Sequence, residues 1–137
     1  MRILIFCSAF LLLPRIALGQ NPDSTQALLN PVVFDGDSVQ YFVGKKIAVI
    51  GQVINVSKVQ GKDGTMGFVN MFKAYPNNPF SVTIFRQSLA FFEPIEQYEG
   101  KKVRVTGEVN VFKDKNTGKE RYSIILRKPD QIEILGK

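Results

Sequence analysis

Residues 80–112, FSVTIFRQSLAFFEPIEQYEGKKVRVTGEVNVF, decide the fold because they place a segment of helical periodicity between two strand patterns. Apolar and polar side chains alternate with a period of two in residues 80–85, and again in residues 101–112. Alternation of this kind is typical of a strand with one buried face. Each of these two stretches therefore predicts a strand of a sheet that is covered on one side.

The segment between the two strands has a different periodicity. Leu89, Phe92 and Ile95 recur at the spacing of one helix face. Pro94 prevents one uninterrupted helix, because proline lacks an amide hydrogen and clashes with the preceding turn. We therefore expect a short helix or a capping turn over residues 86–98.

Two strand patterns precede this segment. Residues 47–54 form a long β-branched run, in which Gly51 predicts a bulge or a bend. Residues 67–72 predict a second strand, and the glycine-rich, charged stretch 58–65 between the two predicts an exposed loop. Period two places Val69 and Met71 on one face of the second strand.

Further elements follow and precede these strands. Residues 114–119 predict a hairpin loop, residues 121–126 a fifth strand, and residues 130–135 a short alternating tail that closes an edge. Residues 37–43 predict a short helix or a short strand with Tyr41 and Phe42 against the core, and both alternatives stay open.

Three strands, a short helical element and two more strands are the order of an OB barrel, in which the helix closes one end between strands three and four. An immunoglobulin-like sandwich needs about seven strands, and the chain offers at most six. The predicted class is all-β with a short helix: a five-stranded OB-type Greek-key barrel over residues 31–137.

The chain also resembles a known family in four phrases: GKKIAVIGQVINV (44–56), GFVNMFKAYPNNPFSVTIF (67–85), FFEPIEQYEGKKVRVTGEV (91–109) and KPDQIEI (128–134). These phrases are similar to bacterial, often exported OB-fold proteins that are described as nucleic-acid-binding, with a tRNA/helicase-type, anticodon-binding-like domain. The resemblance covers about residues 44–134. It implies an OB barrel and, less specifically, a nucleic-acid ligand. The hairpin KDKNTGKER (113–121) is longer than is common in that family, so its role is open.

A ligand of an OB barrel usually lies across strands two and three. If Val69 and Met71 fill the barrel, the opposite face of these strands carries three rings. Bases stack on such rings with roughly 1 to 3 kcal/mol each. Alternatively, barrel curvature, the helix or the N-terminal segment covers the rings. The candidate binding residues on this face are Phe68, Asn70, Phe72, Thr83 and Phe85.

Basic residues flank the same face and predict contacts to a phosphate backbone. Asp63, Asp114 and Glu120 lie in the same loops, so an ordinary solvated surface is the alternative. Lys101, Lys102 and Arg104 are expected to lie elsewhere. The basic candidates are Lys58, Lys62, Lys73, Arg86, Lys113, Lys115, Lys119 and Arg121.

The N-terminus has the pattern of a signal peptide over residues 1–19. Arg2 precedes an apolar run at residues 3–13, and Ala17-Leu18-Gly19 offers small residues at the positions that signal peptidase accepts. Eleven apolar residues are too few to span a bilayer, so no stable membrane insertion is expected. We predict export to the periplasm or the medium, followed by a flexible leader at residues 20–30.

Removal of residues 1–19 changes the composition. It takes away Arg2 and Arg15 but no acidic residue, so the net charge falls from +6 to +4, and it takes away the only cysteine, Cys7. The chain has no histidine. A mature chain of this composition has neither thiolate nor imidazole ligands. Asp35 and Asp37 have no arginine nearby, and the glutamates at 93, 96 and 99 suit a solvated cap better than a ligand set. We therefore expect no metal, no cofactor and no enzymatic activity.

Three classes of function remain. The first is a module that binds single-stranded DNA or RNA through the aromatic face and basic loops. The second is an envelope module that binds oligosaccharide or protein, since OB barrels also bind oligosaccharides on this face. The third is a structural subunit that associates with itself. The oligomeric state is left open.

The signal peptide gives a direct prediction. In a bacterial host that exports the protein, the intact mass of the exported form is expected to match a chain that begins at Gln20. Mass spectrometry of the envelope and medium fractions measures this. A chain that keeps residues 1–19 in those fractions would contradict the predicted cleavage.

Overall fold

The computed structural model describes residues 30–136. The predicted signal peptide and all but the last residue of the predicted leader lie outside these residues. The strands are β1 (Val32–Val33), β2 (Lys46–Gly61), β3 (Gly64–Met71), β4 (Phe80–Ile84), β5 (Lys102–Lys113), β6 (Glu120–Ile125) and β7 (Ile132–Leu135). The helical elements are η1 (Gly36–Phe42), α2 (Arg86–Leu89), η2 (Ile95–Tyr98) and η3 (Pro129–Gln131).

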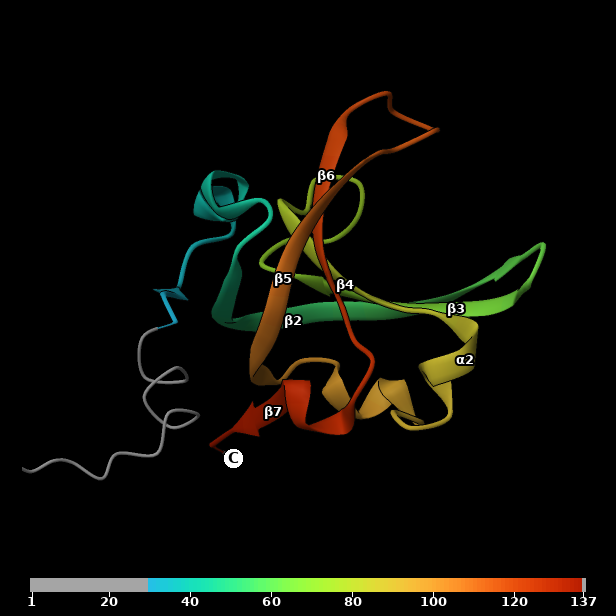
Figure 1. Ribbon diagram of the computed structural model, residues 1–137. Coiled ribbons are helices and arrows are strands. Elements are labelled where there is room, and N and C mark those ends of the chain that lie inside the picture. The colour runs from blue at the N-terminus through green and yellow to red at the C-terminus, as the bar shows by residue number, and fades with distance from the viewer. Residues whose placement is uncertain (1–29, 137) are drawn as a thin grey trace, which may run out of the picture. The chain divides into compact units, whose positions relative to one another are not determined.

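Five strands close into a barrel. The hydrogen-bonded order is β2-β3-β4-β6-β5, and β5 pairs back with β2. β2 closes the barrel because residues 46–52 pair with β5, whereas residues 53–61 pair with β3. The β4–β6 pair is parallel and the other pairs of the barrel are antiparallel. Figure 1 shows β2 and β3 extending together beyond the barrel as a long hairpin. The predicted five-stranded OB-type Greek-key barrel is confirmed.

Short strands extend the sheet on both sides of the closure. β7 pairs antiparallel with β5, which confirms the predicted edge-closing tail, and β1 pairs in parallel with β2. Residues 36–42, which include most of the segment predicted as helix or strand, form the 3-10 helix η1. Phe42 packs against the core as expected, but Tyr41 is 76% exposed, which corrects its predicted burial.

The barrel interior contains Val69 and Met71, as predicted, and two residues of β4. Val69, Met71, Val82 and Ile84 are fully buried, and burial of each side chain stabilises the fold by roughly 1.5 to 3 kcal/mol. The predicted helical segment lies at one end of the barrel (Figure 1), where it buries Leu89, Phe92, Ile95 and Tyr98. In the part of the chain that the structure describes, no helix has the length and hydropathy needed to cross a membrane.

The irregularity in the pairing of β2 does not lie at Gly51, where the sequence predicted a bulge or a bend. The register shift lies between Val53 and Asn55, whereas Gly51 stays in regular pairing with Val103. A Cβ at position 51 would clash with the ring of Phe72. Glycine at position 51 therefore allows the Phe72 ring to pack closely against β2, and it does not form a bulge.

The predicted loop at residues 58–65 is mostly strand. β2 continues to Gly61 and β3 begins at Gly64, so that only Lys62 and Asp63 remain as the turn. Across the hairpin, the Thr65 hydroxyl donates a hydrogen bond to the Gln60 side chain at 2.8 Å. The segment is therefore a regular β-hairpin with a two-residue turn, and not an exposed loop.

The inward-facing Gly107 generates a prediction about barrel closure. A Cβ at this position would lie 2.6 Å from Cγ2 of the buried Ile124. Gly107→Ala should lower the free energy of unfolding by about 1 to 3 kcal/mol, which is the usual cost of overpacking. Urea denaturation of the mature protein measures this value.

Gly61→Ala is the matched control, because a Cβ there meets only the Gly64 carbonyl oxygen at 3.5 Å. It should change the free energy of unfolding by no more than about 0.5 kcal/mol. Equal effects of the two variants would contradict the packing that we describe at Gly107.

Candidate functional site

A groove of about 780 Å³ lies on the outer face of the barrel beside the β5–β6 hairpin. Strands β2, β3 and β4 form its base, and the β3–β4 connection and the β5–β6 hairpin form its walls. We call this site the groove. Its lining residues are Asn55, Ser57, Val59, Met66, Phe68, Asn70, Tyr75, Asn78, Ser81, Phe112, Lys113, Asp114, Lys115, Asn116 and Arg121.

Three aromatic rings line the groove, although they are not the predicted three. Phe68 is half-buried on β3, as expected for a residue of the outer face. Tyr75 and Phe112 join it and are 47% and 44% exposed. Phe112 could have been identified from the sequence as an outward-facing ring, because it occupies the otherwise polar face of the alternating stretch 101–112. Tyr75 lies in the β3–β4 connection, where periodicity gives no signal.

The guanidinium group of Arg121 holds the two walls together. Its Nη1 donates to the Asn78 carbonyl oxygen at 2.8 Å, and its Nη2 donates to that of Pro76 at 2.8 Å. Its Nε donates to Asp114 Oδ2 at 3.1 Å, and its central carbon lies 4.9 Å from the centre of the Tyr75 ring. The Arg121 side chain is only 11% exposed. Arg121, predicted as a phosphate contact, therefore links the β3–β4 connection to the β5–β6 hairpin.

Asp114 is the acidic centre of this network. Its carboxylate accepts hydrogen bonds from the backbone amide of Asn116 at 2.8 Å and from the Tyr75 hydroxyl at 3.1 Å. The hydrogen bond from the Asn116 backbone amide, together with those from Arg121 and Tyr75, lowers the pKa of this carboxyl from its usual 3.8. Asn116 also donates to the Tyr75 hydroxyl at 3.2 Å. The exposed Tyr75 ring is therefore held in position at its edge.

A row of asparagine side chains crosses the base of the groove. Asn78 Nδ2 donates to Asn70 Oδ1 at 3.2 Å, and Asn70 Nδ2 donates to Asn55 Oδ1 at 3.3 Å. Asn70 and Asn78 are each 5% exposed. Buried amides need partners, and these supply one another. Asn70, a predicted binding residue, thus lies in the groove with much of its hydrogen-bonding capacity already used.

Phe72 is the clearest departure from the expected row of rings. Strand geometry ends at Met71, and Phe72 has a φ of 72°. This left-handed conformation removes Phe72 from the alternation of β3. Its ring lies against Gly36 and Gly51 and packs on the core. The prediction that Phe72 shares the outer face with Phe68 is wrong.

Two further predicted residues of this face also lie outside the groove. Thr83 is 6% exposed, and its Oγ1 lies 2.7 Å from Ser123 Oγ in a hydrogen bond between β4 and β6. Phe85 is half-buried and lines a separate hollow at the tip of the β2–β3 hairpin. The expected row of Phe68, Phe72 and Phe85 is therefore not formed.

Lys58 does not flank the groove. Its ammonium nitrogen lies 2.8 Å from Glu93 Oε2 and 3.8 Å from Glu96 Oε2. Its neighbours Ser57 and Val59 line the groove, so period two turns Lys58 to the other face. The hydrogen bond with Glu93 raises the pKa of Lys58 and lowers that of Glu93. Lys58 joins β2 to the helical segment.

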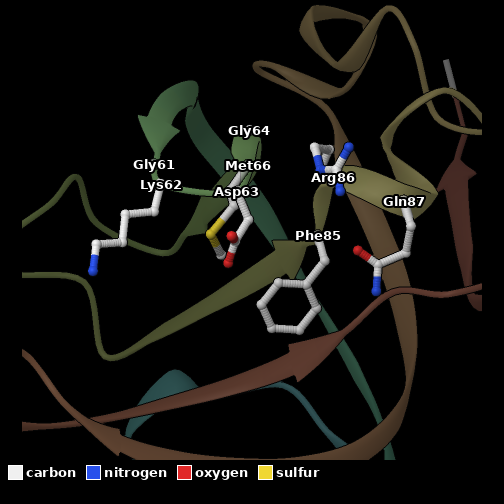
Figure 2. A pocket seen from close by; sticks show the side chains of 8 residues that line it. All are labelled: Gly61, Lys62, Asp63, Gly64, Met66, Phe85, Arg86 and Gln87. Carbon is white, nitrogen blue, oxygen red and sulfur yellow. The ribbon is translucent and has the colours of Figure 1, made fainter.

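The remaining basic candidates fall into three groups. Lys113 and Lys115 line the groove, and neither is in an ion pair within the described residues. Lys73 and Lys119 are exposed near the walls without lining it. Lys62 and Arg86 line the separate hollow (Figure 2). Arg104, expected elsewhere, pairs with Glu133 at 3.1 Å.

The groove is therefore an aromatic and amide surface with two lysines available to a ligand. The carboxylate of Asp114 is already occupied by Arg121. Over residues 30–136 there is no group of three histidine, cysteine, aspartate or glutamate side chains that could hold a metal ion. The groove offers stacking and hydrogen bonding.

Comparison with known proteins gives structural similarities only. No protein-family model matches the chain, and no curated protein sequence matches it. An aspartyl tRNA synthetase from Entamoeba histolytica matches with a TM-score of 0.50 and 12% identity, over 87% of this chain and 24% of the synthetase. This similarity agrees with the OB fold.

Two further solved structures match with lower TM-scores. The Plasmodium falciparum SSB in complex with ssDNA has a TM-score of 0.45 and 17% identity, over 66% of this chain and 94% of that chain. A small single-stranded DNA-binding protein from Streptomyces coelicolor has a TM-score of 0.42 and 20% identity, over 66% and 93%. The fold assignment rests on strand pairing and not on these two similarities.

The lowered pKa of Asp114 predicts a pH-dependent stability. A carboxyl whose folded pKa is depressed stabilises the fold fully above its unfolded pKa and loses that contribution as the pH falls through the folded value. Asp114→Asn should therefore be less stable than wild type at neutral pH. The difference should narrow as the pH falls below 3.8.

Urea denaturation of both proteins between neutral pH and about pH 2 measures this difference. Comparing the two proteins at each pH cancels the other carboxyl groups, which they share. A difference that stays constant over the whole range would show that the Asp114 charge does not stabilise the walls.

Proposed function

We propose that this OB-fold domain binds single-stranded nucleic acid in the groove. The observation that carries the proposal is the grouping of Phe68, Tyr75 and Phe112 beside Lys113 and Lys115 on one concave surface. Flat apolar rings stack on bases of any sequence, and neighbouring cations follow the backbone. The site is thus built for a flexible strand with exposed bases.

The rigidity of the walls supports this role. Tyr75 is fixed by hydrogen bonds at its hydroxyl and by the Arg121 guanidinium over its ring. A ring that is already ordered loses little conformational entropy when a base stacks on it. Preorganisation of this kind favours binding through stacking at Tyr75.

The small number of free cations sets the expected salt dependence. Lys113 and Lys115 are the lysines that line the groove. Each neutralised phosphate of a single strand contributes about 0.7 to the slope of log affinity against log salt. We therefore expect a moderate slope, with much of the affinity supplied by stacking.

The asparagine side chains favour oligosaccharide as a second candidate. Asn116 contacts Tyr75, and Asn55 also lines the groove. Amides near an aromatic ring suit sugar hydroxyls and the apolar face of a sugar. OB barrels bind both classes of ligand. Oligosaccharide binding would be insensitive to salt and to loss of Lys113 and Lys115.

We also propose that the domain acts outside the cytoplasm. Residues 1–19 carry this proposal by their sequence alone, through the apolar run at 3–13 and the cleavage pattern at 17–19. Under this proposal its ligand would be single-stranded DNA or RNA outside the cytoplasm.

Phe112→Ala tests the proposed function. Fluorescence anisotropy with a labelled oligonucleotide at about 50 mM salt should show binding by the mature wild-type protein. The variant should bind about tenfold more weakly, because stacking supplies roughly 1 to 3 kcal/mol per base. Phe91→Ala is the matched control, since Phe91 is 64% exposed and lies between α2 and η2.

The double variant Lys113→Ala/Lys115→Ala tests the backbone contact. It should reduce the salt slope by about 1.4, and the control Lys101→Ala/Lys102→Ala should leave the slope unchanged. Absence of binding by wild type at micromolar concentration would overturn the proposal. Salt-independent binding of oligosaccharide would favour the second candidate.

A further inference from the structure

A second hollow lies between the tip of the β2–β3 hairpin and helix α2. It has a volume of about 480 Å³ and is lined by the turn at residues 61–64, Met66, Phe85, Arg86 and Gln87 (Figure 2). We call it the tip hollow. Met66 also lines the groove, so the two sites adjoin at this side chain.

The strand register makes the two sites continuous. Met66 and Phe68 lie two residues apart on β3, so they point to the same face about 6.8 Å apart. Gly67 pairs with Ile84 of the antiparallel strand β4. One residue further along each strand, Met66 and Phe85 therefore lie beside each other. An apolar strip therefore runs from Phe68 over Met66 to Phe85.

The tip hollow differs from the groove in the state of its carboxylate, because Asp114 of the groove is paired with Arg121. The Asp63 carboxylate and the Gln87 amide line it together with the Phe85 ring. Asp63 is in no ion pair among the described residues. A carboxylate accepts a hydrogen bond from an exocyclic amino group such as N4 of cytosine, whereas thymine presents a carbonyl oxygen at the corresponding position.

Two cations, Lys62 and Arg86, line the same hollow. Gly64 has a φ of 121° and no Cβ, and the aliphatic part of Arg86 lies in the space that a Cβ there would need. In Figure 2 the Lys62 side chain extends away from the Phe85 ring. This arrangement suits a base stacked against Phe85, with its phosphates directed toward Arg86 and Lys62.

We propose that the tip hollow holds one base of a single strand that occupies the groove, and that Asp63 selects a base with an exocyclic amino group over thymine or uracil. The proposal rests on the proposed function of the groove. It adds a defined second compartment and a base preference. Stacking on the groove rings alone would not produce such a preference.

Two pyrimidine strands test the preference, because their rings have the same size. Fluorescence anisotropy compares labelled oligocytidylate and oligothymidylate of about 12 nucleotides on the mature wild-type protein. Wild type should bind the cytosine strand about fivefold or more tightly. Asp63→Asn should abolish this ratio, because an amide presents both a donor and an acceptor.

Phe85→Leu tests stacking while it keeps an apolar side chain at the start of α2. It should weaken binding of both strands about threefold or more, whereas the control Phe91→Leu should not. Circular dichroism spectra and thermal melting are compared across the variants, so that loss of fold is distinguished from loss of contact.

The outcomes separate the two proposals. Equal affinity of wild type for both strands, or an affinity ratio that Asp63→Asn leaves unchanged, overturns the proposal for the tip hollow. If Phe112→Ala still weakens binding in that case, the groove stands. If wild type binds neither strand, the proposed function itself is overturned.

Discussion

The Arg121 guanidinium is the constraint on which the outer face of this barrel depends. It lies almost buried, and a buried cation is tolerated only where its hydrogen bonds are satisfied. Two backbone carbonyls of the β3–β4 connection and the carboxylate of Asp114 satisfy them. These partners come from both walls of the groove, so Arg121, together with the hydrogen bonds of Tyr75 to Asp114 and Asn116, fixes the distance between the walls.

This constraint changes the electrostatics of the site. Arg121 and Lys58 are cations on β6 and β2, but each is committed to carboxylates of the same chain. Charge that is used to hold the fold is not available to a phosphate. Under the proposed function, binding at the groove would depend more on ordered rings than the basic composition suggests. It would depend on the few lysines of the β5–β6 hairpin for contact with the phosphate backbone.

The elements that could be predicted from the sequence are those governed by periodicity. The order of strands and the buried rows on β3 and β4 follow from period two, and the barrel follows from that order. The errors occur where one residue leaves the pattern. Phe72 adopts a positive φ, and the partner of Lys58 lies on a helical segment about 35 residues away. Neither fact is encoded in local alternation.

The rings that line the groove beside Phe68 are Tyr75 and Phe112, and not the predicted Phe72 and Phe85. The number of aromatic residues in a segment is therefore a weaker guide to a stacking surface than the position of each ring. A ring serves as a stacking surface only if its face is exposed and its orientation is fixed. Tyr75 meets both conditions. Asp114 and Asn116 hold its hydroxyl and the Arg121 guanidinium lies over its ring, while 47% of the residue stays exposed. Phe72 fails the first, since its ring fills the space left by two glycines. Burial and anchoring thus divide the rings of one short segment between the core and the surface.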